Sequence, residues 1–218
     1  MKTVAVLNDM DGLLVNSEQL YLEANQIYFQ QFGIEFTAKL HGQGAGRKFD
    51  KWIPTIFPDL PVSGKEVLAA RNKIFFQLAE QKLTLLPGAR EYLELVSRNF
   101  KNALVTSSRQ DYLDIVFRKT GIYTCFDLVI DATMVEQGKP DPECYLMAAR
   151  MLAVEPSKCL VFEDAPSGIM AGKAAGMKVV NIPSPYVIGN PDLKKADFHL
   201  KSIKNVSLEY IKSLGSAS

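Results

Sequence analysis

Near its start the chain reads Val4-Ala5-Val6-Leu7-Asn8-Asp9-Met10-Asp11-Gly12. The apolar residues 4–7 predict a short buried strand, and two carboxylates follow that strand one residue apart. Open α/β sheets place their chemistry outside the carboxyl ends of their strands. Asp9 and Asp11 are therefore placed to bind a hard cation and to attack an electrophile such as a phosphoryl group.

The stretch that follows has a helical pattern. Apolar residues recur at helical spacing over residues 18–32, and Gly33 follows as a stop. Residues 65–83 show the same spacing, and residues 34–83 contain no pattern of a buried strand. We therefore predict a helical cap domain over residues 17–82, inserted into an α/β core made of residues 1–16 and 83–218.

Beyond a break at Pro87-Gly88, strand and helix patterns alternate. Strands are predicted over residues 103–105, 128–130, 160–162 and 179–182, and helices over residues 110–119, 142–152 and 167–175. This alternation predicts parallel β-α-β units with right-handed crossovers, and hence a doubly wound, Rossmann-like sheet. Residues 212–218 are small and polar, which predicts a frayed end.

Composition narrows the class of protein. The 218 residues are 47% hydrophobic and 22% charged, and 25 Lys and Arg against 24 Asp and Glu give a net charge of +1. No basic field is available for nucleic acid or an anionic membrane. The three cysteines have no CxxC spacing, and neither a signal peptide nor a membrane span is apparent. We expect a cytoplasmic monomer whose partner is a small phosphate ester.

Polar residues follow the predicted strands. Thr106 and Ser107 follow the second strand, Lys139 precedes the helix at residue 142, and Glu163 and Asp164 follow a later strand. The carboxyl ends of parallel strands share one edge of a sheet, so these residues are expected to meet Asp9 and Asp11 there. Each feature alone is an ordinary helix cap or acidic turn, but together, in order, they favour a functional site.

The carboxylates suit phosphoryl transfer. Asp9 could attack phosphorus and form an aspartyl-phosphate. Two anions must then approach each other, which calls for Mg²⁺, and Asp164 and Glu163 could supply further oxygen ligands. Asp11 is placed to protonate the leaving oxygen and later to deprotonate the attacking water. A calcium loop is excluded, because the D-x-D-x-D-G spacing is absent.

Three further residues suit the binding of phosphate. The Thr106 hydroxyl and the Ser107 backbone N–H can bind phosphate oxygens near the amino terminus of a helix. Lys139 can neutralise charge on Asp9 and on the phosphoryl group.

Four segments in this order resemble the motifs of haloacid-dehalogenase-like hydrolases. They are residues 4–18, Leu104-Val105-Thr106-Ser107-Ser108, Gly138-Lys139-Pro140-Asp141-Pro142 and Val161-Phe162-Glu163-Asp164-Ala165-Pro166-Ser167-Gly168. The helical insertion is similar to the cap of the subgroup that contains β-phosphoglucomutase and phosphatases of sugar phosphates or nucleotides, pseudouridine monophosphate among them. The resemblance spans the whole chain.

The resemblance implies a role for each matching residue. Asp9 would be the nucleophile and a Mg²⁺ ligand, and Asp11 the acid/base, with its backbone carbonyl on Mg²⁺. Thr106 would bind phosphate, Lys139 would steady the nucleophile, and Asp164 would bind metal with Glu163 beside it. Dehalogenase members lack the second aspartate and the metal, so Asp11 favours phosphoryl transfer over carbon–halogen cleavage.

Several residues depart from the family pattern. Asn8 replaces an apolar residue, and a buried amide there needs hydrogen-bond partners. Asn16 stands where Asp is common, which we interpret as a tolerated variation at the hinge. Tyr21 stands where β-phosphoglucomutase has a histidine, and residues 40–47 lack an arginine at the position where the mutase has one. Both of these last departures favour a phosphatase over a mutase.

Selection of the substrate is expected to come mainly from the cap, which would also exclude water. Candidate selectors are Glu18, Tyr21, His41, Gln43 and Arg47, with Arg109 and Gln110 facing the same cleft by analogy. Gly42-x-Gly44-x-Gly46 lacks the spacing of a P-loop and predicts a flexible or tightly turned loop.

The leading hypothesis is a Mg²⁺-dependent phosphatase of sugar, polyol or nucleoside monophosphates. A sugar phosphomutase of the β-phosphoglucomutase type is an alternative enzyme. A non-enzymatic phospho-acceptor module is a third, because receiver modules also surround a phosphorylated aspartate with acidic residues, a hydroxyl and a lysine. The long insertion between Asn16 and Leu83 argues against this third hypothesis.

Overall fold

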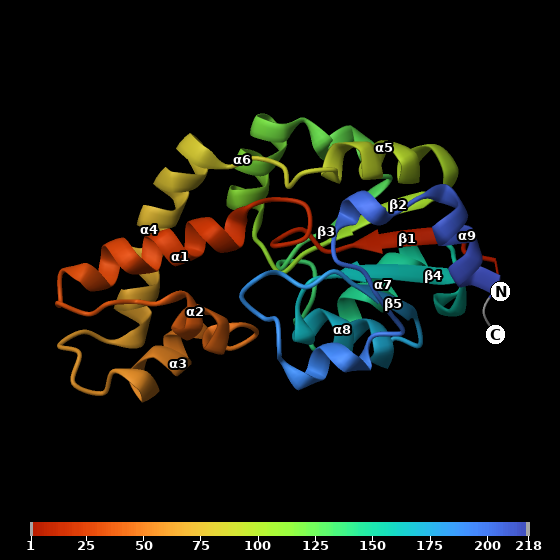
Figure 1. Cartoon of the computed structure of the whole chain (residues 1–218). Coiled ribbons are helices and arrows are strands. Elements are labelled where there is room, and N and C mark those ends of the chain that lie inside the picture. Colours follow the sequence, from red (N-terminus) through yellow and green to blue (C-terminus); the bar gives the residue numbers. More distant parts are fainter. Residues whose placement is uncertain (1, 217–218) are drawn as a thin grey trace.

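The computed structural model describes residues 2–216, and within them six parallel strands form one sheet in the order β3-β2-β1-β4-β5-β6 (Figure 1). The strands are β1 (Ala5–Asn8), β2 (Lys101–Val105), β3 (Leu128–Ile130), β4 (Cys159–Glu163), β5 (Lys178–Asn181) and β6 (Phe198–His199). Because β1 pairs with both β2 and β4, the strand order reverses beside it. The predicted doubly wound α/β fold is confirmed.

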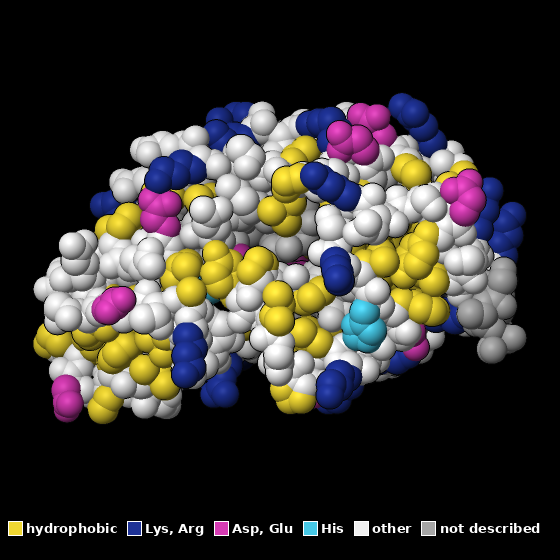
Figure 2. Space-filling model, in the orientation of Figure 1, with side chains coloured by type: hydrophobic (Ala, Val, Ile, Leu, Met, Phe, Trp, Pro, Cys, Tyr) yellow, Lys and Arg dark blue, Asp and Glu magenta, His cyan; other side chains and the backbone are white. Residues whose placement is uncertain are grey.

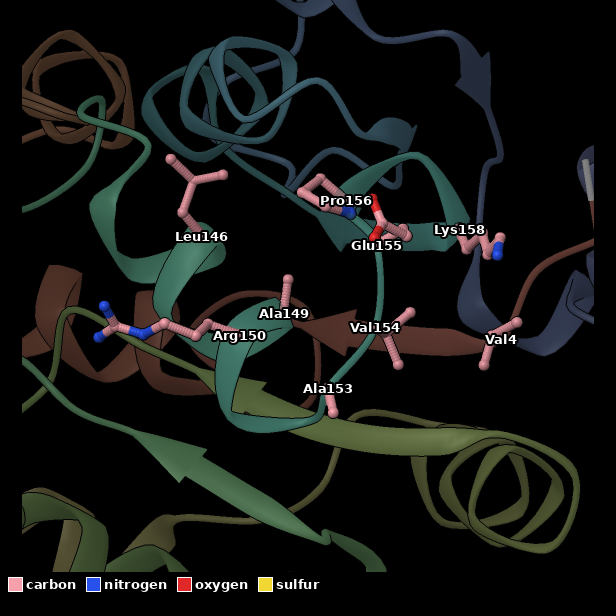
Figure 3. A pocket seen from close by; sticks show the side chains of 9 residues that line it. All are labelled: Val4, Leu146, Ala149, Arg150, Ala153, Val154, Glu155, Pro156 and Lys158. Carbon is pink, nitrogen blue, oxygen red and sulfur yellow. The ribbon is translucent and has the colours of Figure 1, made fainter.

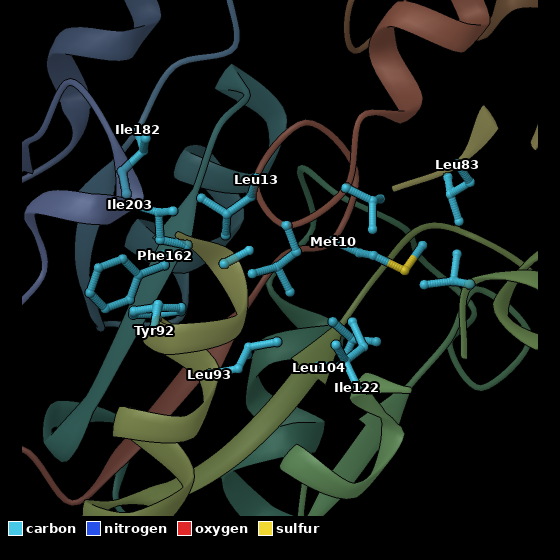
Figure 4. Packing of buried hydrophobic residues seen from close by; sticks show 14 of the residues in the cluster. Met10, Leu13, Leu83, Tyr92, Leu93, Leu104, Ile122, Phe162, Ile182 and Ile203 are labelled. Atoms are coloured by element: carbon cyan, nitrogen blue, oxygen red, sulfur yellow. The ribbon is translucent and has the colours of Figure 1, made fainter. Parts of the chain in front are cut away.

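Helices cover both faces of the sheet. One face carries α5 (Ala89–Asn99), α6 (Gln110–Thr120) and α9 (Leu208–Ser216), and the other carries α7 (Glu143–Met151) and α8 (Pro166–Ala174). The alternation of side chains along β1 explains this division, because Val6 packs on the first face while Ala5 and Leu7 pack on the second. Figure 4 shows the first face, where Tyr92 of α5 lies against Phe162 of β4 with ring centroids 5.2 Å apart.

Four helices between Ser17 and Lys82, which we call the helical insertion, form a separate lobe in Figure 1. They are α1 (Ser17–Gln30), α2 (Ala38–Gly44), α3 (Phe49–Ile56) and α4 (Gly64–Lys82). Their own apolar cluster includes Phe29, Phe36 and Trp52. The helix α4 starts at a capping box, in which the Ser63 hydroxyl accepts from the Glu66 N–H and the Glu66 carboxylate accepts from the Ser63 N–H.

The two chain segments that join the insertion to the sheet run beside each other. The Asn16 N–H donates to the carbonyl of Thr84 (3.1 Å), and the Asn16 Oδ1 accepts from the Thr84 N–H (2.9 Å). The Asn16 Nδ2 also donates to the carbonyl of Lys82 (3.3 Å), and Val15 and Leu85 form an antiparallel bridge. Asn16 therefore fastens one hinge segment to the other.

Two parts of the sequence prediction were wrong. The tail was predicted to fray from residue 212, but α9 continues to Ser216, because Ile211 and Leu214 are buried against the sheet. Residues 217–218 of that prediction lie outside the described residues. Gly42 and Gly44 belong to α2 rather than to a loop, and only Gly46 of the three has a positive φ, +75°.

Several elements were not predicted individually, although α2 and α3 lie within the predicted helical cap domain. They are the helices α2, α3, α5 and α9, the edge strand β6, and the 3-10 helices η1 (Ile122–Cys125), η2 (Pro156–Lys158), η3 (Pro191–Lys195) and η4 (Ile203–Asn205). Over residues 2–216, no helix has the length and apolar character needed to cross a bilayer.

Candidate active site

Apart from Thr106, the polar residues predicted to meet do so at the carboxyl edge of the sheet, where the strand order reverses. Asp9 follows β1, and Glu163 and Asp164 lie at the end of the neighbouring strand β4. One carboxylate oxygen from each lies within 4.8 Å of the others, and all three residues are buried. This cluster opens into a cleft of about 320 Å³ between the sheet and the helical insertion. The lining residues are Asp9, Asp11, Glu18, Ala45, Gly46, Arg47, Lys48, Ser107, Lys139, Glu163, Asp164, Ala165, Ser167, Ser184 and Val187.

Lys139 is the cation at the centre of this cluster. Its Nζ lies 2.6 Å from the Asp9 Oδ1 and 2.6 Å from the Glu163 Oε1, and it donates to the carbonyl of Val105 at 3.0 Å. Burial lowers the pKa of Lys139, but the carboxylates of Asp9 and Glu163 raise it more, so the net pKa lies well above its usual range. The ammonium group is therefore charged and fixed beside Asp9.

For the acids the net effect is the reverse, because burial disfavours their charged forms more than Lys139 favours them. Burial raises the pKa of Asp9 to about 8, against the lowering effect of Lys139. Burial, together with Asp9 and Glu163, also raises the pKa of Asp164 well above its usual range. A single lysine thus faces three buried carboxyl groups, and a divalent cation bound among them would favour their ionised forms.

Two glycines make room for the acids. At Gly12, where φ is +77°, an added Cβ would lie 2.2 Å from the Asp164 Oδ2. At Gly168, an added Cβ would lie 1.6 Å from the Glu163 Oε1. Any other residue at these positions would displace a carboxylate, which explains the Gly in each of the two motifs.

The Glu163 carboxylate accepts four hydrogen bonds. Its Oε1 accepts from Lys139 and from the Tyr145 hydroxyl (2.7 Å), and its Oε2 accepts from the N–H groups of Asp164 (3.1 Å) and Ala165 (3.3 Å). Tyr145 is fully buried, and its ring centroid lies 5.0 Å from the Lys139 Nζ. Asp9 and Asp164 therefore have freer oxygens than Glu163 does.

Asp11 lies beside this group with one oxygen fixed. Its Oδ2 accepts from the Ser108 hydroxyl at 2.7 Å, while its buried Oδ1 has no hydrogen-bond partner within residues 2–216. Burial raises the pKa of Asp11, against the lowering effect of the Ser108 hydroxyl. A carboxyl group with a raised pKa and a free oxygen is suited to exchange a proton with a substrate or a water molecule.

The turn after β2 places its residues differently. Ser107 is exposed and lines the cleft. Thr106 is buried and outside the cleft lining, and its Oγ1 accepts from the Ser108 N–H at 3.0 Å. The Thr106 hydroxyl thus shapes the turn that presents Ser107 and Ser108.

The predicted selectors fall into two groups. Glu18 and Arg47 line the cleft. His41 lies just behind Glu18, with its Nε2 2.9 Å from the Glu18 Oε2, and the Tyr21 ring is stacked on Phe75. Outside the cleft lining are Tyr21, His41, Gln43, Arg109 and Gln110, and the Gln110 Nε2 donates to the Asp114 Oδ1.

Sequence reasoning missed several residues of the site. Tyr145 and Ser108 contact the carboxylates, and Lys48, Ser167, Ser184 and Val187 line the cleft. Ser108 directly follows the Thr106-Ser107 pair, so its position was a usable clue. Ser184 and Val187 follow β5, a strand end from which no candidate residue had been taken.

Another hollow, of about 410 Å³, lies at the opposite edge of the sheet (Figure 3). It is lined by Val4, just before β1, and by Lys158, just before β4, and its charged residues Arg150, Glu155 and Lys158 are all exposed. Figure 2 shows positive and negative side chains interspersed over the face in view. Buried ionisable groups of the kind that suit catalysis are found at the cleft, so the cleft is the candidate site.

Comparisons with known proteins agree with this geometry. A family model described as haloacid dehalogenase-like hydrolase matches residues 6–182. A phosphorylated carbohydrates phosphatase of Thermotoga maritima is 35% identical over 181 residues, which cover 80% of this chain and 82% of that protein. The β-phosphoglucomutase of Bacillus subtilis is 30% identical, covering 95% and 93% of the two chains.

A solved structure supports the fold. The crystal structure of a conserved haloacid dehalogenase-like protein from Agrobacterium tumefaciens superposes with a TM-score of 0.86, covering 99% of this chain and 100% of that one. At 20% sequence identity, this likeness concerns the fold alone.

Proposed function

This chain belongs to the haloacid dehalogenase-like hydrolases, and from that premise we propose that it is a Mg²⁺-dependent phosphatase of small phosphorylated metabolites. Membership of the family confirms the expectation of an enzyme. The observation that carries the proposal is the Asp9 carboxylate, held 2.6 Å from Lys139 within a cluster of buried acids. Sugar, polyol and nucleoside monophosphates are the proposed substrates.

The donor set fits magnesium. All of the candidate donors are oxygens, and a divalent cation would stabilise the ionised forms of buried acids that share a single lysine. We assign Asp9 and Asp164 as the ligands, because Glu163 already accepts four hydrogen bonds and instead fixes Lys139. When bound, Mg²⁺ would offset the repulsion between the Asp9 carboxylate and the phosphoryl group.

The reaction consists of two successive displacements at phosphorus, and each protein group has its own role in them. An oxygen of Asp9 attacks phosphorus, the ester P–O bond breaks, and Asp11 gives its proton to the leaving oxygen. A water then attacks the aspartyl-phosphate, Asp11 takes the water's proton, and free phosphate leaves while Asp9 is restored. Lys139 neutralises charge on Asp9, and Ser107 binds phosphate oxygens from the turn after β2.

We further propose that the helical insertion acts as a cap. The α2 helix already contacts the sheet lobe, since an added Cβ at Gly42 would lie 2.1 Å from the Tyr186 carbonyl oxygen. The His41 ring lies edge-on to the Tyr186 ring, with centroids 4.9 Å apart. Closure of this kind would exclude water and bring Glu18 and Arg47 against the substrate.

A sugar phosphomutase is the second candidate, favoured by the likeness to the β-phosphoglucomutase of Bacillus subtilis. The surroundings of Tyr21 favour a phosphatase instead. Its ring is stacked on Phe75 with centroids 3.7 Å apart, and no polar group at this position reaches the cleft lining. Isomerisation of a hexose 1-phosphate faster than phosphate release would reverse this ranking.

Replacement of the nucleophile tests the proposal. The Asp9→Asn variant should fold and lose more than 99% (about 10²-fold or greater) of the phosphate release seen with an aryl phosphate. Asp59→Asn, which changes an exposed aspartate of the helical insertion, is the matched control and should retain activity. Activity of the unchanged protein should require Mg²⁺ and vanish with EDTA. Full turnover by Asp9→Asn would remove Asp9 as the nucleophile.

The natural substrate class needs a second measurement. We expect a phosphate-release screen with sugar, polyol and nucleoside phosphates to show one preferred class, because Glu18 and Arg47 give the cleft a defined pattern of charge.

A further inference from the structure

The loop after β5 forms a wall of the cleft from the sheet side. Two of its residues, Ser184 and Val187, line the same cleft as Asp9 and Asp11. Turn hydrogen bonds hold the loop in shape, because the Val187 N–H donates to the Ser184 carbonyl (3.2 Å) and the Asn190 N–H donates to the Val187 carbonyl (3.0 Å). The backbone at Ser184 is therefore held by turns within the loop itself.

The Ser184 hydroxyl is buried and unpaired. The residue is 3% exposed, and its Oγ has no hydrogen-bond partner within residues 2–216. A buried polar group without a partner costs about 1–3 kcal/mol, and folded proteins satisfy most such groups. Because Ser184 lines the cleft, a molecule bound in the cleft can supply the missing partner.

Ser184 lies away from the phosphate position. The order of strands runs β2-β1-β4-β5, with Ser107 after β2, Asp9 after β1 and Ser184 after β5. Neighbouring strands are about 4.8 Å apart, so the line of β5 is roughly 10 Å from that of β1. This separation suits the carbon chain of a phosphate ester whose phosphorus is at Asp9.

The helical insertion approaches the same region from the other side. At Gly42 the Tyr186 carbonyl leaves no room for a side chain, and an added Cβ at Gly46 would lie 3.7 Å from Ser167. In Figure 1 the loop after β5 extends toward α2. A ligand in this part of the cleft is thus enclosed between the loop and the insertion.

The chemistry of the loop indicates what it binds. Residues 182–190 include no charged residue, and the cleft-lining Val187 is 5% exposed and apolar. A serine hydroxyl can both donate and accept a hydrogen bond, which matches the hydroxyl group of a sugar or polyol beside its carbon chain. The loop itself offers no cation for a second phosphate, since the cleft-lining Arg47 and Lys48 belong to the helical insertion.

We infer that Ser184 is a specificity-determining residue, which hydrogen-bonds a hydroxyl group on the leaving group of the substrate. The inference rests on the proposed phosphatase and extends it, because it favours polyol and sugar phosphates over esters without hydroxyl groups. It also places one selector on the sheet lobe, outside the helical insertion.

Binding to a variant without turnover tests the inference. Calorimetry on Asp9→Asn protein with Mg²⁺ would compare sorbitol 6-phosphate with phenyl phosphate, each with Ser184 intact and with Ser184→Ala. Loss of one neutral hydrogen bond should weaken the binding of sorbitol 6-phosphate about five- to tenfold more than the binding of phenyl phosphate. Equal effects on both ligands, no effect on either, or no binding of either ligand would overturn the inference.

Two controls separate this result from other causes. Ser97→Ala removes an exposed hydroxyl on α5 and should leave both affinities unchanged. Ser184→Ala should be at least as stable to urea as the unchanged protein, because it removes a buried hydroxyl that has no internal hydrogen-bond partner. A clear loss of stability would show a structural role and overturn the inference. If Asp9→Asn still turns over, the proposed nucleophile fails, and the same ratio is measured in kcat/KM.

Discussion

Asn8 is a completely buried amide in the first strand, at a position where an apolar residue was expected. Its Nδ2 donates to the Asn102 Oδ1 (2.7 Å) and to the Ala103 carbonyl (3.2 Å), and its Oδ1 accepts from the Tyr92 hydroxyl (2.5 Å). Asn102 in turn donates to the Cys125 carbonyl. The amide is therefore fully partnered, and it joins β1, β2 and α5 just before Asp9.

Truncation of this network should destabilise the fold. Asn8→Ala leaves the Tyr92 hydroxyl and the Asn102 Oδ1 without partners, so we expect the free energy of unfolding to fall by about 2–4 kcal/mol. Tyr92→Phe leaves only the Asn8 Oδ1 unpaired and should cost about 1–2 kcal/mol. Urea unfolding of both single variants and the double variant would measure this. Fully additive losses would show that the network does not act as a unit.

At the same scale, motif residues were easier to predict than their supports. Asp9, Lys139 and Asp164 lie in short segments with a recognisable order. Tyr145 supports Glu163 from 18 residues away, and Ser184 reaches the cleft from a loop with no motif. Such contacts depend on how helices and loops pack, and the local sequence carries no pattern that marks them.

At the scale of elements, Asn16 is a hinge residue that contacts both segments joining the helical insertion to the sheet. The Thr84 N–H and the Lys82 carbonyl both bind its amide. From the sequence alone, we interpret Asn16 as a tolerated variation at a position where Asp is common. An aspartate would keep the acceptor for Thr84 and lose the donor to Lys82.

The two replacements at the hinge should differ. Asn16→Ala removes both side-chain hydrogen bonds and should lower the free energy of unfolding by about 1–2 kcal/mol and reduce kcat/KM severalfold, because the insertion is then less well oriented. Asn16→Asp should lower the free energy of unfolding by about half as much as Asn16→Ala does. Urea unfolding and steady-state kinetics would test both. Equal behaviour of the two variants would contradict the role given to the Thr84 contact.

Helices and strands were predictable where the sequence has a clear apolar pattern, and were missed where it has none. The strands β2, β3 and β4 were predicted because each contains three consecutive apolar residues. The helix α9 was missed because Ile211 and Leu214 are its only buried residues among those described, and its stability comes from docking on the sheet. Gly42 and Gly44 suggested a loop, yet Gly42 allows α2 to contact Tyr186.

At the scale of the molecule, one edge of the sheet concentrates buried charge. Asp9 and Asp164 have raised pKa values, Asp9 to about 8, mainly through burial. Between pH 3.8 and about 8 the folded protein then holds protons that the unfolded chain has released. The contribution of this cluster to the free energy of unfolding therefore falls as the pH rises through that window.

Bound Mg²⁺ should counteract this loss of stability at higher pH. Bound Mg²⁺ favours the ionised carboxylates, so we expect it to raise the free energy of unfolding more at pH 8 than at pH 5. Urea unfolding across this range, with Mg²⁺ and with EDTA, would measure the effect. Asp164→Asn removes one titrating group and should flatten the pH dependence in EDTA. An unchanged slope in that variant would contradict the assigned cause.

The hinge has a consequence for engineering and for evolution. Residues 16 and 84 are hydrogen-bonded neighbours, so the chain leaves the sheet lobe and re-enters it at almost one point. A different lobe could be spliced in at these two positions without stretching either segment or disturbing the acids after β1. Such a graft would keep the Asp9 chemistry and Ser184 while it replaced Glu18 and Arg47. Substrate preference could thus be changed by replacing the helical insertion as one unit, while the reaction itself stays the same.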